Sequence, residues 1–161
     1  SLSAMISKLG TAKYIIAILQ SINFTPILIP ACIFLFGAVI SFSTGSSWGT
    51  FAMLMPLAIP MGHVFGISYA ICLGAVLSGG LFGDHCSPLS DTTILSSMGA
   101  ECNLVDHVRT QLPYASINGV LAFIGFIIAG ITGSAISTAI AVGLLLVVIF
   151  GWNYYDRKHV G

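Results

Sequence analysis

The most informative stretch of this sequence reads Gly83-Asp84-His85-Cys86-Ser87-Pro88-Leu89-Ser90-Asp91-Thr92-Thr93. It carries two carboxylates in a chain where charged residues are otherwise scarce. No Asp, Glu, Lys or Arg occurs from residue 14 to residue 83, and none occurs from residue 110 to residue 155. Apolar stretches of about 18 or more residues without charge are candidates for crossing a membrane. The stretch therefore predicts a polar interruption within a membrane-embedded segment.

The composition of the whole chain points the same way. Of its 161 residues, 57% are hydrophobic and 6% are charged, whereas soluble domains contain about 25% charged residues. The alternative, the buried core of a soluble protein, would need more surface charge than this chain has. We therefore expect an all-α integral membrane protein in a lipid bilayer. The net charge of zero gives no sign of a nucleic-acid partner.

The four cysteines, at positions 32, 72, 86 and 102, form no CxxC pair. Their spacing predicts no disulfide framework, so we interpret them as small packing residues.

A second polar stretch lies at residues 41–50, with six hydroxyl side chains and two glycines. Such residues are poor helix formers. The apolar arm that follows, residues 51–61, contains Pro56 and Pro60 and at 1.5 Å per residue covers about half of a bilayer core. We therefore expect a re-entrant helical hairpin followed by one broken transmembrane helix and two further transmembrane helices.

The expected segments are as follows. An interfacial amphipathic helix covers 1–22, the re-entrant hairpin covers 23–63 with its tip at 43–50, and the broken transmembrane helix covers 66–100 with an unwound segment at 83–92. A cytoplasmic connector covers 101–112, two transmembrane helices cover 113–152, and a cytoplasmic tail covers 153–161. The cytoplasmic assignment rests on Arg109, Arg157 and Lys158, because cytoplasmic loops carry an excess of basic residues. Lys8 and Lys13 fit this orientation less well.

The two breaks also predict a cation site. A broken helix offers free N–H groups and unwound carbonyl oxygens, and hard cations prefer oxygen ligands, which suits Na⁺. Hydroxyl and carboxylate side chains complete the set. The first break contributes Thr44, Gly45, Ser46, Ser47 and Thr50, and the second contributes Asp84, His85, Ser87, Ser90, Asp91, Thr92 and Thr93.

Asp84 and Asp91 are the leading candidates for metal ligands, with Na⁺ as the expected ion. A carboxylate at membrane depth is a functional-site hypothesis by default. Desolvation favours its protonated form, whereas a nearby cation favours its ionised form, so one group can exchange a proton for a cation. The alternative is that each Asp is a helix cap or a loop residue near the interface. His85 either titrates near physiological pH or is a hydrogen-bonded structural imidazole.

Two other kinds of site compete with this interpretation. Residues 45–49 match G-x-S-x-G, so an intramembrane serine hydrolase using Ser47 and His63 is conceivable, although that motif requires a strand–turn–helix. Asp84, His85, Cys86 and Asp91 are also metal-ligand types. However, adjacent ligands lack the spacing of two to four residues usual in zinc sites.

Three stretches resemble the NhaC-type Na⁺/H⁺ antiporters of the broader ion-transporter group. They are Phe42-Ser43-Thr44-Gly45-Ser46-Ser47-Trp48-Gly49-Thr50-Phe51, residues 83–97, and Asp106-His107-Val108-Arg109-Thr110-Gln111-Leu112-Pro113-Tyr114. The resemblance covers nearly the whole chain and corresponds to the C-terminal part of the family. Leu89 stands where Ile is expected and Ser46 where Thr is common; neither change removes an oxygen ligand.

The resemblance implies half of an inverted-repeat transporter in which hairpin tips meet helix breaks near the midplane. It implies Na⁺/H⁺ antiport by alternating access, with Na⁺ and H⁺ as transported ions and no other cofactor, rather than an enzyme. Some members exchange organic acids such as malate and lactate, so a Na⁺- or H⁺-coupled carboxylate exchanger is the alternative. The expected location is the cell (inner or plasma) membrane, as a multi-pass protein. The chain has no initiating Met, and we expect the N-terminal half of the same transporter as its partner; a homo-oligomer is left open.

Overall fold

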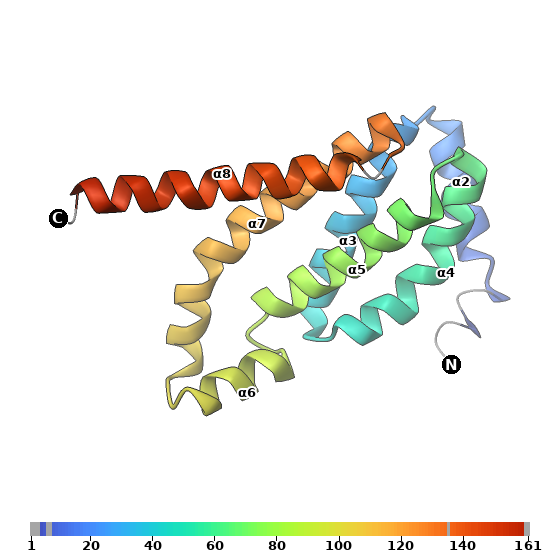
Figure 1. The fold of residues 1–161 in the computed structure, drawn as a ribbon. Helices are drawn as coiled ribbons and strands as arrows, with labels where there is room; N and C mark the ends of the chain where they lie inside the picture. Colours follow the sequence, from blue (N-terminus) through green and yellow to red (C-terminus); the bar gives the residue numbers. More distant parts are fainter. Residues whose placement is uncertain (1–3, 6–7, 135, 160–161) are drawn as a thin grey trace.

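The computed structural model describes residues 4–5, 8–134 and 136–159, and the described residues form helices joined by short turns (Figure 1). In chain order the elements are α2 (Thr11–Ser21), the 3-10 turn η1 (Pro26–Leu28), α3 (Ile29–Thr44), α4 (Ser47–Phe65), α5 (Tyr69–Cys86), α6 (Asp91–Gly99), α7 (Leu104–Thr132) and α8 (Ile136–His159). Parts of the predicted amphipathic helix (1–3 and 6–7) and the end of the predicted tail (160–161) lie outside the described residues. The all-helical fold class is confirmed.

Three helical segments are long and apolar enough to cross a membrane within the described ranges. They are Pro26–Thr44, Ser47–Phe65 and Leu104–Thr132. A fourth candidate is the pair α5 and α6, which is bent by 47° at a short break, and this pair is the broken helix that the sequence predicts. In α8 the apolar part is Ala139–Val148. Figure 1 shows α8 running away from the other helices, and it packs against α7.

The helix that follows the first break is longer than expected. The apolar arm predicted for 51–61 belongs to α4, a continuous helix of 19 residues that includes Pro56 and Pro60. Ser46 begins this helix early, because its Oγ accepts the backbone N–H of Gly49 at 3.3 Å and so caps the first turn. Prolines are tolerated within membrane helices when neighbours satisfy the freed carbonyls. The prediction that this arm covers only half of the bilayer was therefore wrong. How deeply the hairpin enters the membrane stays a prediction.

The second break is shorter than expected. Residues 83–86 continue α5 and residues 91–92 begin α6, so the non-helical part of the predicted segment 83–92 is confined to residues 87–90. Likewise, α7 begins at Leu104, and most of the predicted connector 101–112 is helical. Pro88 ends α5 because the residue before a proline is disfavoured in helical conformation.

The helices α3 and α5 form the most extensive contact of the fold. Their backbones approach so closely that a Cβ at Gly79 would overlap the carbonyl oxygen of Phe34, and one at Gly83 would overlap that of Ala38. Ser41 Oγ donates a hydrogen bond of 2.6 Å to the Gly80 carbonyl across the same crossing. Small residues allow membrane helices to pack at this distance.

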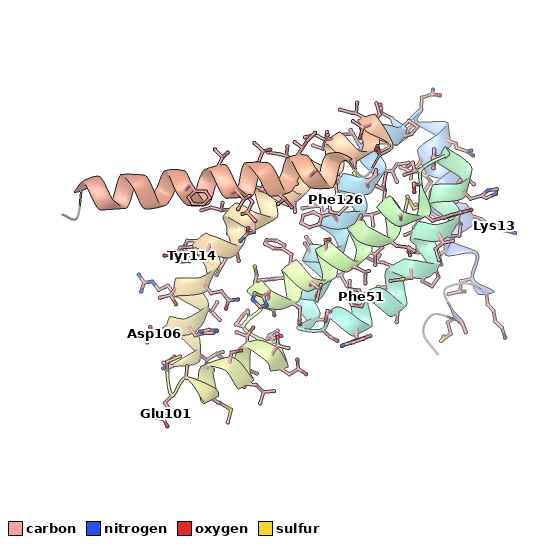
Figure 2. All side chains as sticks on the ribbon, viewed as in Figure 1. Lys13, Phe51, Glu101, Asp106, Tyr114 and Phe126 are labelled. Carbon is pink, nitrogen blue, oxygen red and sulfur yellow. The ribbon has the colours of Figure 1, made fainter. Side chains whose placement is uncertain are left out.

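The helix α7 packs against the crossing of α3 and α5, and Phe126 of α7 contacts an aromatic cluster there. The Phe34 ring stacks on Phe126 and on Phe82, with centroids 5.5 Å and 5.9 Å apart; Figure 2 shows Phe126 where α7 meets α3 and α5. At the far end, a Cβ on Gly130 would overlap the Ile27 carbonyl oxygen. The core between α3, α4 and α5 thus holds the ends of α3 and α5 in a fixed register.

We expect Gly79→Ala to destabilise the protein by about 1–3 kcal/mol, the usual cost of overpacking. The obstacle is the backbone carbonyl of Phe34, which cannot rotate away. Thermal unfolding of the complete transporter in detergent would measure the change.

The matched control is Gly74→Ala on the same helix, where the new methyl would lie 3.9 Å from the Phe126 ring, an ordinary contact. Equal melting temperatures for the two variants would contradict the close crossing.

Candidate functional site

Asp84 lies in the last turn of α5 with 7% of its surface exposed. Its Oδ2 accepts contacts from Ser47 Oγ at 3.5 Å and from Thr92 Oγ1 at 3.4 Å, both near the outer limit for a hydrogen bond. Its Oδ1 is buried and has no hydrogen-bond partner within the described part of the chain. No Lys or Arg occurs between residues 14 and 108 to neutralise it. Burying a carboxylate without a charged partner costs free energy.

Four helix ends meet around this carboxylate. Ser47 belongs to the first turn of α4 and Thr92 to the first turn of α6, while α3 and α5 end at the same place. Helix N-termini carry partial positive charge and present free backbone N–H groups. Helix C-termini present carbonyl oxygens that can help to hold a cation. The arrangement therefore supplies both an anionic group and neutral oxygen atoms at one point.

The turn between α3 and α4 packs directly on the break between α5 and α6. Gly45 has φ of +66°, and a Cβ there would lie 2.7 Å from the carbonyl carbon and oxygen of Leu89. Ser87 Oγ donates to the Phe42 carbonyl at 2.7 Å and accepts the Leu89 N–H at 3.2 Å. These contacts join the two polar stretches of the sequence, and the family resemblance implies the same meeting of hairpin tip and helix break.

The remaining hydroxyls of the first break have structural contacts. Thr44 Oγ1 donates to the Ile40 carbonyl at 2.9 Å and is exposed, and Thr50 Oγ1 donates to the Ser46 carbonyl at 2.9 Å and is buried. Ser46 caps α4. Only Ser47 of this break contacts Asp84.

The residues of the second break divide in the same way. Thr92 contacts Asp84, and Ser90 Oγ lies 2.7 Å from Thr92 Oγ1. Asp91 is exposed, and its Oδ1 accepts the backbone N–H of Thr92 at 2.8 Å in the first turn of α6. Asp91 therefore has the local contacts of a helix-start residue, and the structure does not bring it into hydrogen-bonding contact with Asp84. Thr93 is buried.

Asp84 faces a cavity of about 640 Å³. Two polar side chains of the cavity wall, Ser47 and Thr92, contact Asp84, and most of the wall is aromatic, aliphatic or small. The lining residues are Phe34, Ser47, Trp48, Ser78, Leu81, Phe82, Asp84, His85, Thr92, Ala115, Asn118, Gly119 and Ala122. Ser78 and Asn118 were not among the predicted site residues. The signal for Asn118 was available, since it is an amide within the apolar run that begins at Pro113.

The competing sites find no support in the geometry. Ser47 and His63 lie on one helix, α4, sixteen positions apart, which corresponds to about 24 Å along the axis. They cannot act as a nucleophile and its base. In the described part of the chain, no group of three or more His, Cys, Asp or Glu side chains is placed to hold a metal ion.

A helical membrane chain in which a hairpin turn meets a helix break beside a buried carboxylate has the architecture of secondary transporters. The chain matches the Na⁺/H⁺ antiporter family over residues 1–131. It belongs to that family and is a membrane protein.

Three relatives illustrate the similarity. The chain is 40% identical over 94 residues to the malate-2H⁺/Na⁺-lactate antiporter of Bacillus subtilis, covering 58% of this chain and 20% of the relative. It is 36% identical over 107 residues to the arginine/ornithine antiporter ArcD of Halobacterium salinarum, covering 66% and 22%. It is 37% identical over 92 residues to the Na⁺/H⁺ antiporter NhaC of Alkalihalophilus pseudofirmus, covering 57% and 20%.

The chain thus spans about a fifth of the length of these relatives. Relatives of this kind are antiporters, which are transporters rather than enzymes. No solved structure matches the chain significantly.

We expect Gly45→Ala to separate the two polar breaks, because its methyl would collide with the Leu89 carbonyl. In the complete protein, the variant should have a lower melting temperature and a lower transport rate than the wild type. Gly66→Ala is the matched control: Gly66 also ends a helix, with φ of +68°, but nothing lies within 4 Å of its Cβ position.

Both variants carry the backbone strain of a left-handed residue, about 1–2 kcal/mol. The difference between them therefore isolates the contact with Leu89. Identical losses in the two variants would show that this contact is unimportant.

Proposed function

We propose that this chain is the C-terminal part of a Na⁺/H⁺ antiporter that works by alternating access, and that Asp84 binds either a proton or Na⁺. The observation that carries the proposal is the buried carboxylate of Asp84: its Oδ2 contacts the Ser47 and Thr92 hydroxyls, and its Oδ1 has no hydrogen-bond partner within the described residues. Proton and cation compete for one carboxylate. Release of one on each side of the membrane then couples the two fluxes.

The other predicted site residues have supporting roles in this proposal. Gly45 and Ser87 hold the hairpin turn against the break, and Ser46 and Thr50 fix the start of α4. Ser90 orients the Thr92 hydroxyl. Asp91 stabilises the start of α6 and is the weaker of the two candidate Na⁺ ligands, because it is exposed. Thr44, His85 and Thr93 complete the predicted set, with His85 lining the cavity that Asp84 faces.

The remaining ligands of Na⁺ would come from the N-terminal half of the transporter. The chain spans about a fifth of its relatives, and transporters of this architecture place the site where two repeats meet. We also propose that the protein is a multi-pass protein of the cell membrane, with residues 101–112 and 153–161 on the cytoplasmic side. The basic residues Arg109, Arg157 and Lys158 support this orientation.

A second candidate function is exchange of an organic acid coupled to Na⁺ or H⁺. The cavity beside Asp84 has a volume of about 640 Å³, which is in the range of small-molecule sites and larger than one ion needs. The relative from Bacillus subtilis is named as a malate and lactate antiporter. Ser78 and Asn118 would offer polar contacts to such a substrate.

We expect Asp84→Asn to abolish Na⁺-driven proton movement by the complete transporter in proteoliposomes, because an amide cannot exchange a proton for a cation. Asp91→Asn should retain most of the activity. Ser47→Ala and Thr92→Val should each weaken apparent Na⁺ affinity about fivefold, since one polar contact contributes about 1 kcal/mol.

A pH-sensitive dye inside the vesicles measures the flux, and Lys13→Gln, at an exposed position, is the control for loss of a surface charge. Wild-type flux in Asp84→Asn would refute the assignment of Asp84.

The two candidate functions predict different results in a counterflow experiment, which measures the accumulation of a labelled substrate. If the cargo is an ion alone, labelled malate or lactate will not accumulate in vesicles preloaded with the unlabelled acid. If the cargo is an organic acid, it will accumulate, and Asn118→Leu should reduce the accumulation because it removes an amide from the cavity wall.

A further inference from the structure

A second, smaller cavity lies beside the Asp84 site, between the end of α5, the helix α6 and the start of α7. Its volume is about 260 Å³, and all of its lining residues are polar: His85, Thr92, Thr93, Ser96, His107 and Gln111. We call it the polar chamber. Two imidazoles, three hydroxyls and an amide thus line one space in a chain that is 57% hydrophobic. Polar cavities of this size hold water, at about 30 Å³ per molecule.

Gln111 adds an amide to the wall of the chamber and links the start of α7 to the end of α5. Its Nε2 donates to the His85 carbonyl at 3.1 Å, and this bond fixes which end of the amide is the oxygen. Its Oε1 is buried and has no hydrogen-bond partner within the described residues. Asp84 Oδ1 is in the same situation. Both atoms are acceptors, and leaving a buried acceptor unsatisfied is costly.

The chamber and the larger cavity share two wall residues, His85 and Thr92. Thr92 also contacts the Asp84 carboxylate through its hydroxyl at 3.4 Å. One side chain therefore stands between the buried carboxylate and the chamber.

The other end of the chamber is near the turn between α6 and α7. His107 lies in the first turns of α7, and the exposed acidic residues Glu101 and Asp106 flank the same turn. Figure 2 shows both acidic side chains at this end of the molecule. Acidic groups at the mouth of a polar passage raise the local concentration of cations.

We propose that the polar chamber is a hydrated passage for a small cation between the turn at residues 100–103 and Asp84. The identity of the cation in this passage rests on the proposed function, whereas the existence of the passage does not. Water held by the hydroxyls and imidazoles of the lining residues replaces part of the hydration shell of the cation on its way to Thr92. The larger cavity, with its mostly apolar wall, is not needed for this route.

Cysteine accessibility in sealed vesicles tests the passage. Starting from a complete transporter without cysteines, Ser96→Cys is labelled with a membrane-impermeant, cationic methanethiosulfonate added to one side at a time. The native Cys102 is exposed in the turn, so a variant that keeps Cys102 alone identifies which side of the membrane holds residues 100–103. Ser96→Cys should react from that side only.

Leu95→Cys is the matched control, one position away on α6 and pointing outward with 65% exposure. We expect it to react at least about tenfold more slowly than Ser96→Cys, since ionised thiols and the charged reagent both require water. Equal rates for the two positions would mean that α6 as a whole lies in water, and no reaction of Ser96→Cys would mean that the chamber is closed. Either result overturns the passage.

The same labelling in the Asp84→Asn background separates this inference from the proposed function. Continued reaction of Ser96→Cys there supports the passage whether or not the transporter exchanges Na⁺. In the active protein, labelling should reduce transport at least about tenfold relative to the same unlabelled variant. Full transport after complete labelling would contradict the passage even if Na⁺/H⁺ exchange is established.

Discussion

The contact between the backbones of α3 and α5 controls the rest of this structure. Glycines at 79 and 83 let the two helices approach until carbonyl oxygens take the space of side chains, and Ser41 adds a hydrogen bond across the contact. Because the helices cannot slide past each other, their C-terminal ends stay level. Asp84, in the last turn of α5, is therefore held beside the turn that follows α3, where Ser47 begins the next helix.

The breaks themselves are acceptable in a membrane because their polar groups are satisfied locally. Ser87 bonds to the carbonyl of Phe42 and to the N–H of Leu89, and Ser46 caps α4. Non-helical backbone at membrane depth survives only when it is buried in protein or faces water. Here each break is largely the partner of the other, and Asp84 Oδ1 is left over. Within the described residues, one buried acceptor without a hydrogen-bond partner therefore lies beside the contact between the two breaks.

Much of this arrangement could be predicted from the sequence, because membrane helices are read from long uncharged runs and breaks from clustered Ser, Thr and Gly. The difference between Asp84 and Asp91 could not. The two carboxylates are seven positions apart in one polar stretch, but α5 continues through Cys86, so Asp84 sits on a packed helix while Asp91 starts an exposed one. The full length of α4 could not be predicted, because Pro56 and Pro60 argue against a regular helix and the cap at Ser46 is seen only in the structure. The roles of Ser78, Asn118 and Gln111 depend on which helices face each other, and local sequence carries little information about that.

The two prolines of α4 make this helix easier to bend than α3 and α5. Pro56 and Pro60 each lack a backbone N–H, so two successive turns of this helix have a missing hydrogen bond, whereas α3 and α5 are clamped along their length. Bending is therefore least costly in the middle of α4, at a distance from both of its ends. A bend there would move the start of α4, which carries Ser47, relative to the paired helices α3 and α5.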